Sequence, residues 1–160
     1  MTRNTLEIGS PRMRLFSEQV VLPESNGLKV CSALIKIQDQ TISDVHIMDR
    51  QTFEKMPKDS ETHDLGRNIL GPSFINGHTH LAMSSLRGVG QQALRGNVVE
   101  DLYYTLESHL QPEDVRAFVR MGAYENLLCG ITAVWDHYYH AQDIALALED
   151  VGLCGVVAPT

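Results

Sequence analysis

The segment Gly71-Pro-Ser-Phe-Ile-Asn-Gly-His-Thr-His-Leu81 constrains this chain more than any other. A short apolar run follows a Gly-Pro turn and ends in two histidines that one residue separates. Because residues i and i+2 of a β-strand point to the same side, the imidazoles of His78 and His80 are expected side by side. Neighbouring imidazoles suit one metal ion. The alternative interpretation is that both rings bond to backbone or water at a strand end.

Composition and charge narrow the possible partners. The 160 residues are 43% hydrophobic and 21% charged, which is enough apolar material for a core, and the formal net charge is −7. Nucleic acids and anionic membranes both need a basic face, so neither is expected as a partner. No apolar run reaches the ~20 residues of a membrane span. Three widely spaced cysteines, Cys31, Cys129 and Cys154, predict reduced, buried thiols in a cytoplasmic protein.

Residues 12–70 have the pattern of β-structure. A run rich in β-branched residues covers 28–37, Asp39-Gln40 is typical of a turn, and a second apolar run covers 42–47. Residues 55–64 are polar and are expected to form a surface loop.

After residue 70 the pattern alternates between strands and helices. Asn97 and Glu100 have the spacing of a capping box, and Pro112 begins a second helix that Gly130 ends. A strand over 131–135, a helix over 143–150 and a strand over 153–158 follow. This order predicts parallel βαβ units. Three strands are only part of a (β/α)8 barrel, which takes roughly 250 residues.

Several segments carry a resemblance to the metal-dependent amidohydrolase superfamily. The histidine segment resembles that family's first barrel strand, and Leu81-Ala-Met-Ser-Ser-Leu-Arg-Gly88 resembles the loop that follows it. Gly130-Ile-Thr-Ala-Val-Trp-Asp136 is similar to the second strand. The combination is most similar to the branch of cytosine and guanine deaminases, methylthioadenosine/S-adenosylhomocysteine deaminases and chlorotriazine hydrolases. The resemblance covers about 145 residues and does not specify a substrate.

This resemblance implies an α/β fold, the N-terminal part of a (β/α)8 TIM barrel. Residues 1–70 would form part of a small β-sandwich, and residues 71–160 the first three βα units of an incomplete barrel. His78 and His80 match the family's strand-one metal ligands, with one divalent ion bound, Zn²⁺ in preference to Fe²⁺. No catalytic acid or base can be assigned, because the family supplies those groups from later strands.

The implied activity is hydrolysis of a C–N or C–Cl bond of a small heterocyclic substrate, with deamination as the first choice. A metal ion held by imidazoles leaves a position for water and lowers the pKa of that water. We expect the chain to form a homo-oligomer, or to bind a second chain that supplies the rest of the barrel.

Other polar residues near the strand ends have less definite roles. His137 shares the face of Trp135 and is a candidate for substrate binding, although an exposed loop position is an equal alternative. His140 is expected in a solvent-exposed loop, and Asp136 as a cap or turn residue. Arg87 and Trp135 are expected to be structural, whereas His46, His63 and His109 are expected at the surface.

Two other functions fit the same residues. One is a truncated, non-catalytic metal-binding or interaction subunit of a split enzyme, because unpaired strand edges invite association. The other is an oxygenase with two histidines and one carboxylate on iron. Asp136 is the chief candidate for that carboxylate.

Overall fold

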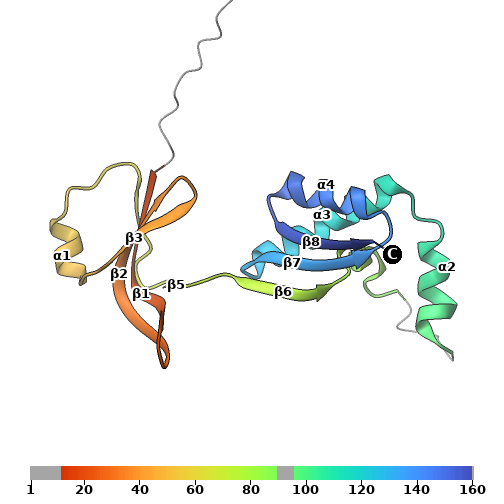
Figure 1. Cartoon of the computed structure of the whole chain (residues 1–160), viewed down its shortest axis with the longest axis horizontal. Helices are drawn as coiled ribbons and strands as arrows, with labels where there is room; N and C mark the ends of the chain where they lie inside the picture. Colours follow the sequence, from red (N-terminus) through yellow and green to blue (C-terminus); the bar gives the residue numbers. More distant parts are fainter. Residues whose placement is uncertain (1–11, 90–95, 160) are drawn as a thin grey trace, which may run out of the picture. The chain divides into compact units, whose positions relative to one another are not determined.

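The computed structural model describes residues 12–89 and 96–159. The chain divides into two compact units, residues 1–72 and residues 73–160, and each is described by itself (Figure 1).

The first unit is a five-stranded sheet built on one long hairpin. Strands β1 (Arg12–Glu24) and β2 (Gly27–Gln38) pair antiparallel, and β3 (Thr41–Ile47) pairs antiparallel with β2. The short strands β4 (Thr62–Asp64) and β5 (Ile69–Leu70) pair parallel with β1. Asp39 and Gln40 form the predicted turn with φ values of 52° and 62°, and a two-residue hairpin turn of this kind needs positive φ at both positions.

A short helix interrupts the β-structure predicted for this part of the chain. Helix α1 (Arg50–Lys55) begins at Asp49, whose side chain accepts a hydrogen bond from the Thr52 backbone N–H over 2.8 Å. Its Phe53 ring stacks on the buried Phe16 ring, with 3.9 Å between the centroids. The prediction missed this helix because six residues are too few to show an apolar repeat.

Arg50 of α1 joins two strands of the sheet. Its guanidinium donates hydrogen bonds to Glu18 on β1 and to Asp64 on β4, and it lies 4.8 Å from the centre of the Phe16 ring. The hydrogen bond from Arg50 is the main reason that the pKa of the Asp64 carboxyl lies below its usual value.

This lowered pKa gives an expected pH dependence. A carboxyl whose pKa falls on folding contributes stability above its unfolded pKa, and the contribution is lost as the pH falls through the folded pKa. Asp64→Asn is therefore expected to lower the free energy of unfolding at pH 7, with a difference from the wild type that narrows as the pH falls below about 3.9, the pKa of an unfolded aspartate. Urea unfolding across this pH range measures both free energies, and a constant difference would contradict the expectation.

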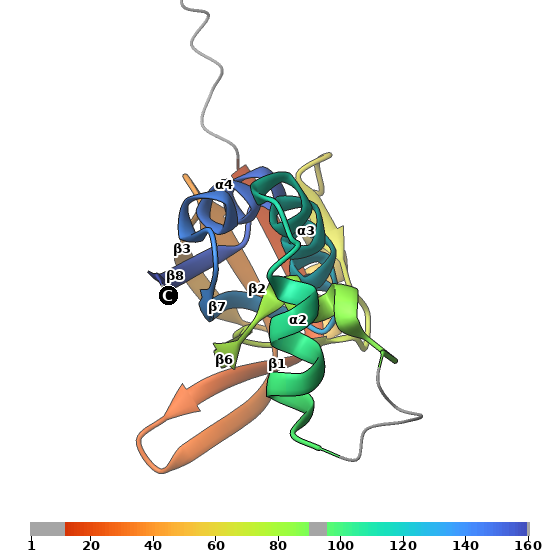
Figure 2. The ribbon, with the colours of Figure 1, turned by 90° about the vertical axis from the view of Figure 1, so that its right-hand side faces the viewer.

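The second unit is a parallel sheet with helices on one face. The strand order is β6 (Phe74–Thr79), β7 (Ile131–Tyr138) and β8 (Cys154–Pro159). Helices α3 (Pro112–Leu128) and α4 (Ala141–Val151) lie together on one side of this sheet (Figures 1 and 2). The 3-10 helix η1 (Leu81–Leu86) follows β6, and a helical stretch of π-helix η2 (Val99–Tyr103) and α2 (Tyr104–Glu107) precedes α3. The predicted parallel alternation of strands and helices is confirmed.

Most of the predicted helix signals are found in this unit, although Glu100 makes no hydrogen bond to the Asn97 N–H among the described residues, so the predicted capping box is only half formed. The Asn97 side chain accepts a hydrogen bond from the Val99 N–H over 3.1 Å, and the apolar stripe of α3 is buried through Val115, Val119 and Ala123. Gly130 ends the following turn with a φ of 75°, which favours glycine. Among the described residues, no helix is long and apolar enough to cross a membrane.

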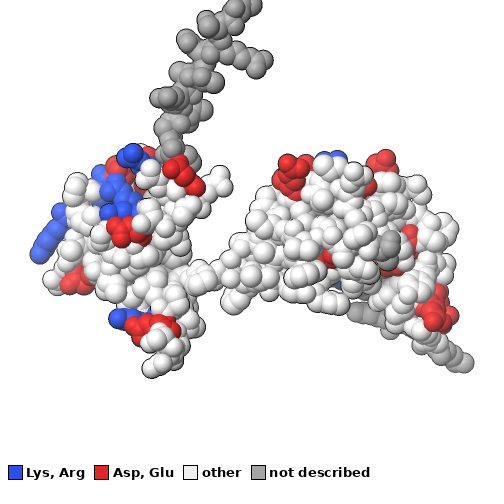
Figure 3. All heavy atoms as spheres, in the orientation of Figure 1, with Lys and Arg blue, Asp and Glu red and all other residues white. Residues whose placement is uncertain are grey.

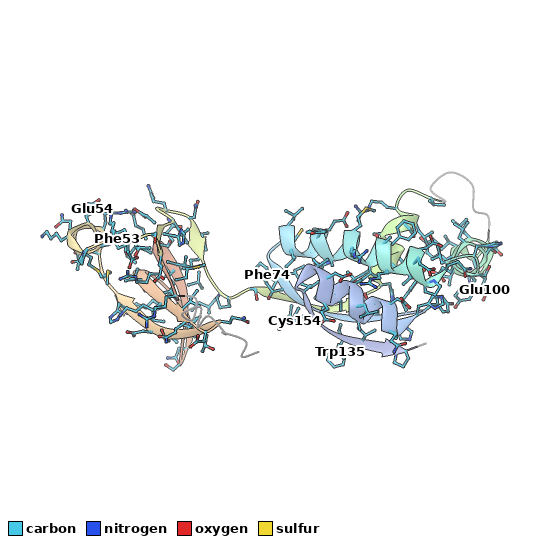
Figure 4. All side chains as sticks on the ribbon, turned by 90° about the horizontal axis from the view of Figure 1, so that it is seen from above. Phe53, Glu54, Phe74, Glu100, Trp135 and Cys154 are labelled. Atoms are coloured by element: carbon cyan, nitrogen blue, oxygen red, sulfur yellow. The ribbon has the colours of Figure 1, made fainter. Side chains whose placement is uncertain are left out.

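The opposite face of the sheet is apolar and exposed. Trp135 is 57% exposed and points away from the helices (Figure 4), and its register partner Val156 on β8 is 52% exposed. In the view of Figure 3 the surface of this unit is mainly uncharged, with acidic side chains near α2 and α4. Cys129 and Cys154 are exposed and Cys31 is half-buried, so the prediction of buried thiols was wrong.

Gly122 lets α3 approach the backbone that follows β6. A Cβ atom at this position would lie 2.7 Å from the Leu81 carbonyl oxygen. Alanine is preferred over glycine inside a helix by about 0.5–1 kcal/mol, so helix propensity alone makes Gly122→Ala stabilising. The contact with Leu81 predicts the opposite, a loss of about 1–3 kcal/mol in the free energy of unfolding. Urea unfolding decides between them, and a stabilised variant would refute the close approach.

Candidate metal and substrate site

A β-bulge shapes the end of β6. Asn76 pairs with Val134 and Thr79 with Asp136, so Gly77 and His78 together stand opposite the single residue Trp135. An extra residue in one strand bends it and turns the side chains that follow. The Asn76 side chain accepts from the His78 N–H over 3.3 Å and donates to Asn126 of α3 over 3.1 Å. The bulge is therefore tied to the helix behind it.

The two histidines of the predicted pair lie next to each other. The ring centroids of His78 and His80 are 5.0 Å apart, and the ring planes are nearly perpendicular at 80°. His78 is exposed and His80 is half-buried. Simple strand alternation was the reason for expecting this adjacency, whereas the structure reaches it through the bulge.

The neighbouring strand orients the ring of His80. Its Nδ1 hydrogen-bonds to the backbone carbonyl oxygen of His137 on β7. A carbonyl oxygen only accepts, so Nδ1 carries the proton, and in the neutral ring Nε2 keeps a free lone pair. The ring of His137 lies 6.0 Å from that of His80, between centroids. His137 therefore belongs to this cluster, and its backbone, which the sequence analysis did not consider, contacts His80.

Asp136 lies behind the histidine pair, inside the unit. Its side chain is fully buried, and Oδ2 accepts a hydrogen bond from the Leu81 N–H over 2.9 Å. Burial raises the pKa of the Asp136 carboxyl, and the bond from Leu81 acts in the opposite direction. Within residues 12–89 and 96–159, no group of three His, Cys, Asp or Glu side chains is placed to hold one metal ion. The structure therefore does not join Asp136 to His78 and His80 as the oxygenase alternative requires.

The remaining sequence candidates lie outside this cluster. His140 is exposed, has a φ of 58° and precedes α4. Arg87 forms a two-pronged ion pair with Glu125 of α3, with both N–O distances at 2.6 Å. His46, His63 and His109 are at the surface, as predicted.

Two adjoining hollows meet at His80 and His137. The first has a volume of about 510 Å³ and lies on the exposed face of the sheet, against His78, Trp135 and Ala158. The second has a volume of about 340 Å³ and lies between the ends of β6 and β7 and the helical stretch before α3. Its lining includes four tyrosines, and these are Tyr103, Tyr104, Tyr138 and Tyr139. Flat aromatic walls of this kind suit a planar ring.

Glu107 also lines the smaller pocket, and the sequence analysis missed it. Its side chain is only 8% exposed. Together with burial, this neighbouring carboxylate raises the pKa of the Tyr138 hydroxyl. A buried carboxylate beside a pocket suggests a binding role, because burial of a charge is costly unless a partner offsets it. The sequence signal was faint, because Glu107 begins a polar Glu-Ser-His run between Leu106 and Leu110, and such a run is typical of a solvent-exposed helix face.

The chemistry of this cluster fits a metal ion in part. Imidazole nitrogen is a preferred donor for zinc, and a bond from Nδ1 to a backbone carbonyl is the usual way in which proteins orient a metal-binding histidine. His78 and His80 both line the larger hollow, and their rings would supply two donors to an ion bound there. A structural or catalytic zinc site takes at least three protein ligands, so the complete site requires donors beyond this pair.

Comparisons with known proteins agree with this arrangement. The model of the Amidohydrolase family matches residues 69–159, more than half of the chain. The chain is 35% identical to a 5'-deoxyadenosine deaminase of Methanothrix thermoacetophila over 102 residues, which are 64% of this chain and 25% of that protein. It is 37% identical to a 5-methylthioadenosine/S-adenosylhomocysteine deaminase of Natronomonas pharaonis over 85 residues, 53% of this chain and 20% of that protein.

Solved structures share the fold at lower identity. Guanine deaminase from C. acetobutylicum, with bound guanine, matches with a TM-score of 0.71 and 14% identity, over 91% of this chain and 35% of that chain. Atrazine chlorohydrolase from Arthrobacter aurescens, complexed with zinc, matches with a TM-score of 0.71 and 23% identity, over 92% and 35%. The predicted fold class, an α/β chain that forms only part of a barrel hydrolase, is confirmed.

The chain corresponds to only part of each of these relatives. The chain spans about a quarter of the length of the curated deaminases and about a third of the solved hydrolases. The family match begins at β5 and ends with β8, and thus includes the histidine pair, the bulge and the pocket beside them. The chain belongs to the amidohydrolase family.

Proposed function

We propose that the complete protein is a metal-dependent hydrolase that deaminates the purine ring of an adenosine-type nucleoside. The observation that carries this proposal is the pair of neighbouring imidazoles of His78 and His80, of which His80 also lines a pocket walled by tyrosines. The names of the curated relatives, deaminases of 5'-deoxyadenosine and of methylthioadenosine, support the choice of substrate class.

In this proposal His78 and His80 are metal ligands, and zinc is the ion. The zinc complex of the related chlorohydrolase supports this choice. The bound ion would lower the pKa of a water molecule toward neutrality and so make it a nucleophile. The protein's own contribution is to keep Nε2 of His80 unprotonated and directed, through the bond from Nδ1 to His137.

The pocket beside the pair would bind the nucleoside. The tyrosine rings would stack on the planar base and exclude water from it. Glu107 would accept hydrogen bonds from the hydroxyl groups of the sugar, which offsets the cost of its burial. The ring of His137 borders both hollows and is proposed to contact the base.

The domain assignment remains part of the proposal. Residues 71–160 would be the first three βα units of the catalytic barrel, and residues 1–70 part of a small β-sandwich. The two compact units of the structure divide at residues 72 and 73, close to this boundary.

The ligand role is tested by removal of each histidine. His78→Ala and His80→Ala in the complete protein should each abolish zinc retention and lower turnover at least 100-fold, on the order of the larger effects of disturbing a metal site. Elemental analysis and ammonia release measure the two effects. His63→Ala, an exposed histidine of the first unit, is the matched control and should keep both. A His78→Ala protein with full zinc and full turnover would refute the ligand role.

The substrate role of Glu107 has a separate test. Glu107→Gln keeps the shape of the side chain and removes its charge. It should lower kcat/KM for adenosine about 10- to 100-fold, because hydrogen bonds to a charged group contribute about 1.5–3 kcal/mol. Turnover of free adenine, which lacks the sugar, should change little relative to the wild type. Equal losses for nucleoside and base would show that Glu107 does not bind the sugar.

A further inference from the structure

We propose that Asp136 and Gly122 are positioning residues for His80, and that they act by holding the Leu81 peptide between β7 and α3. The proposal rests on the metal-binding role of His80 proposed above. It assigns a purpose to a buried carboxylate and to a helix-interior glycine, neither of which contacts the pocket.

The first contact fixes the nitrogen side of Leu81. Asp136 Oδ2 accepts the Leu81 N–H over 2.9 Å, and the carboxylate has no exposed surface. Its other oxygen, Oδ1, is buried and has no hydrogen-bond partner among the described residues. A buried carboxylate with one unused oxygen is costly for stability alone. We infer that the carboxylate is kept for its hydrogen bond to Leu81, the residue directly after His80.

The second contact fixes the carbonyl side of Leu81. The Gly122 backbone approaches so closely that an added Cβ would lie 2.7 Å from the Leu81 oxygen and 3.3 Å from its Cα and carbonyl carbon. Leu81 itself is 3% exposed and packs in the core of the unit. The backbone of Leu81, the residue after His80, therefore cannot shift toward the helix at its carbonyl side, and Asp136 holds it at its N–H side.

These contacts act together with the bond on the ring. Two neighbouring residues of β7 accept hydrogen bonds from the two residues that follow β6. The Asp136 side chain accepts from the Leu81 N–H, and the His137 carbonyl oxygen accepts from Nδ1 of His80. If the Leu81 peptide rotates, the backbone of His80 rotates with it, and Nδ1 leaves the carbonyl. Loss of the Asp136 acceptor should therefore change the orientation and the tautomer of the His80 imidazole, although Asp136 is not a ligand.

The test uses four variants of the complete protein, all compared with the wild type. Asp136→Ala removes the acceptor, Asp136→Asn keeps an oxygen that accepts from Leu81, and Gly122→Ala pushes the Leu81 carbonyl. Ser84→Ala is the matched control, because it removes only a hydroxyl, which joins η1 to α3 by donating to the Phe118 carbonyl and makes no hydrogen bond to Leu81. Zinc affinity is measured by chelator competition. The tautomer of His80 is measured by 15N NMR of the metal-free protein with labelled histidine.

Asp136→Ala and Gly122→Ala should weaken zinc binding about 10- to 100-fold, as removal of an outer partner of a metal ligand does. In both, His80 should lose its single Nδ1–H tautomer. Asp136→Asn should restore most of the affinity and the tautomer, and Ser84→Ala should leave both unchanged. If Asp136→Ala does not fold, Gly122→Ala and Asp136→Asn decide the question.

The proposal would be overturned if Asp136→Ala and Gly122→Ala had the same zinc affinity and the same His80 signals as Ser84→Ala. It would also be overturned if Asp136→Asn lost as much zinc affinity as Asp136→Ala. A wild-type protein that binds no zinc would instead refute the proposed function. The NMR comparison on metal-free protein would still decide whether Asp136 and Gly122 position the ring.

Discussion

The hydrogen bond between the Asp136 carboxylate and the Leu81 N–H connects β7 to the residues that directly follow β6, where the candidate site lies. It runs from near the end of β7 to the start of η1, inside the apolar core of the second unit. The geometry of the site depends on this hydrogen bond, because the end of β6 is irregular. A bulge at Gly77 and His78 breaks the register, so regular strand pairing does not by itself fix the direction of the histidine rings. The surrounding contacts from β7 and α3 supply that direction.

The two faces of the sheet carry side chains with different roles. The face toward α3 and α4 carries the buried side chains Val134 and Asp136, which lie in the interior of the unit, and Tyr138, which is buried and also lines the smaller pocket. The opposite face carries Trp135 and His137, which border the hollows. In a parallel α/β sheet, sites form where strands end at the carboxyl side, and the histidine pair lies at such an end.

The sequence predicts the parts of this structure that rest on periodicity or on glycine and proline. Helix α3 was predicted from Pro112, its apolar stripe and Gly130, and the hairpin turn from Asp39-Gln40. The histidine pair was predicted as neighbours. The bulge was not predicted, since Gly77 is its only local signal, and neither was the short helix α1. Glu107 and Asp136 escaped because their roles come from burial, which depends on elements far apart in the chain. Asp136 in particular was expected at a turn, whereas it lies within β7 and is fully buried.

The proposed function depends on His78 and His80 holding the same metal ion. Anomalous diffraction at the zinc edge, from crystals of the complete protein grown with zinc, tests it most directly. If both histidines are ligands, a single peak will lie within about 2.0–2.1 Å of a ring nitrogen of each, and Nε2 will be the atom used by His80. A fully occupied zinc peak elsewhere in the protein, with both rings free of metal, would contradict it.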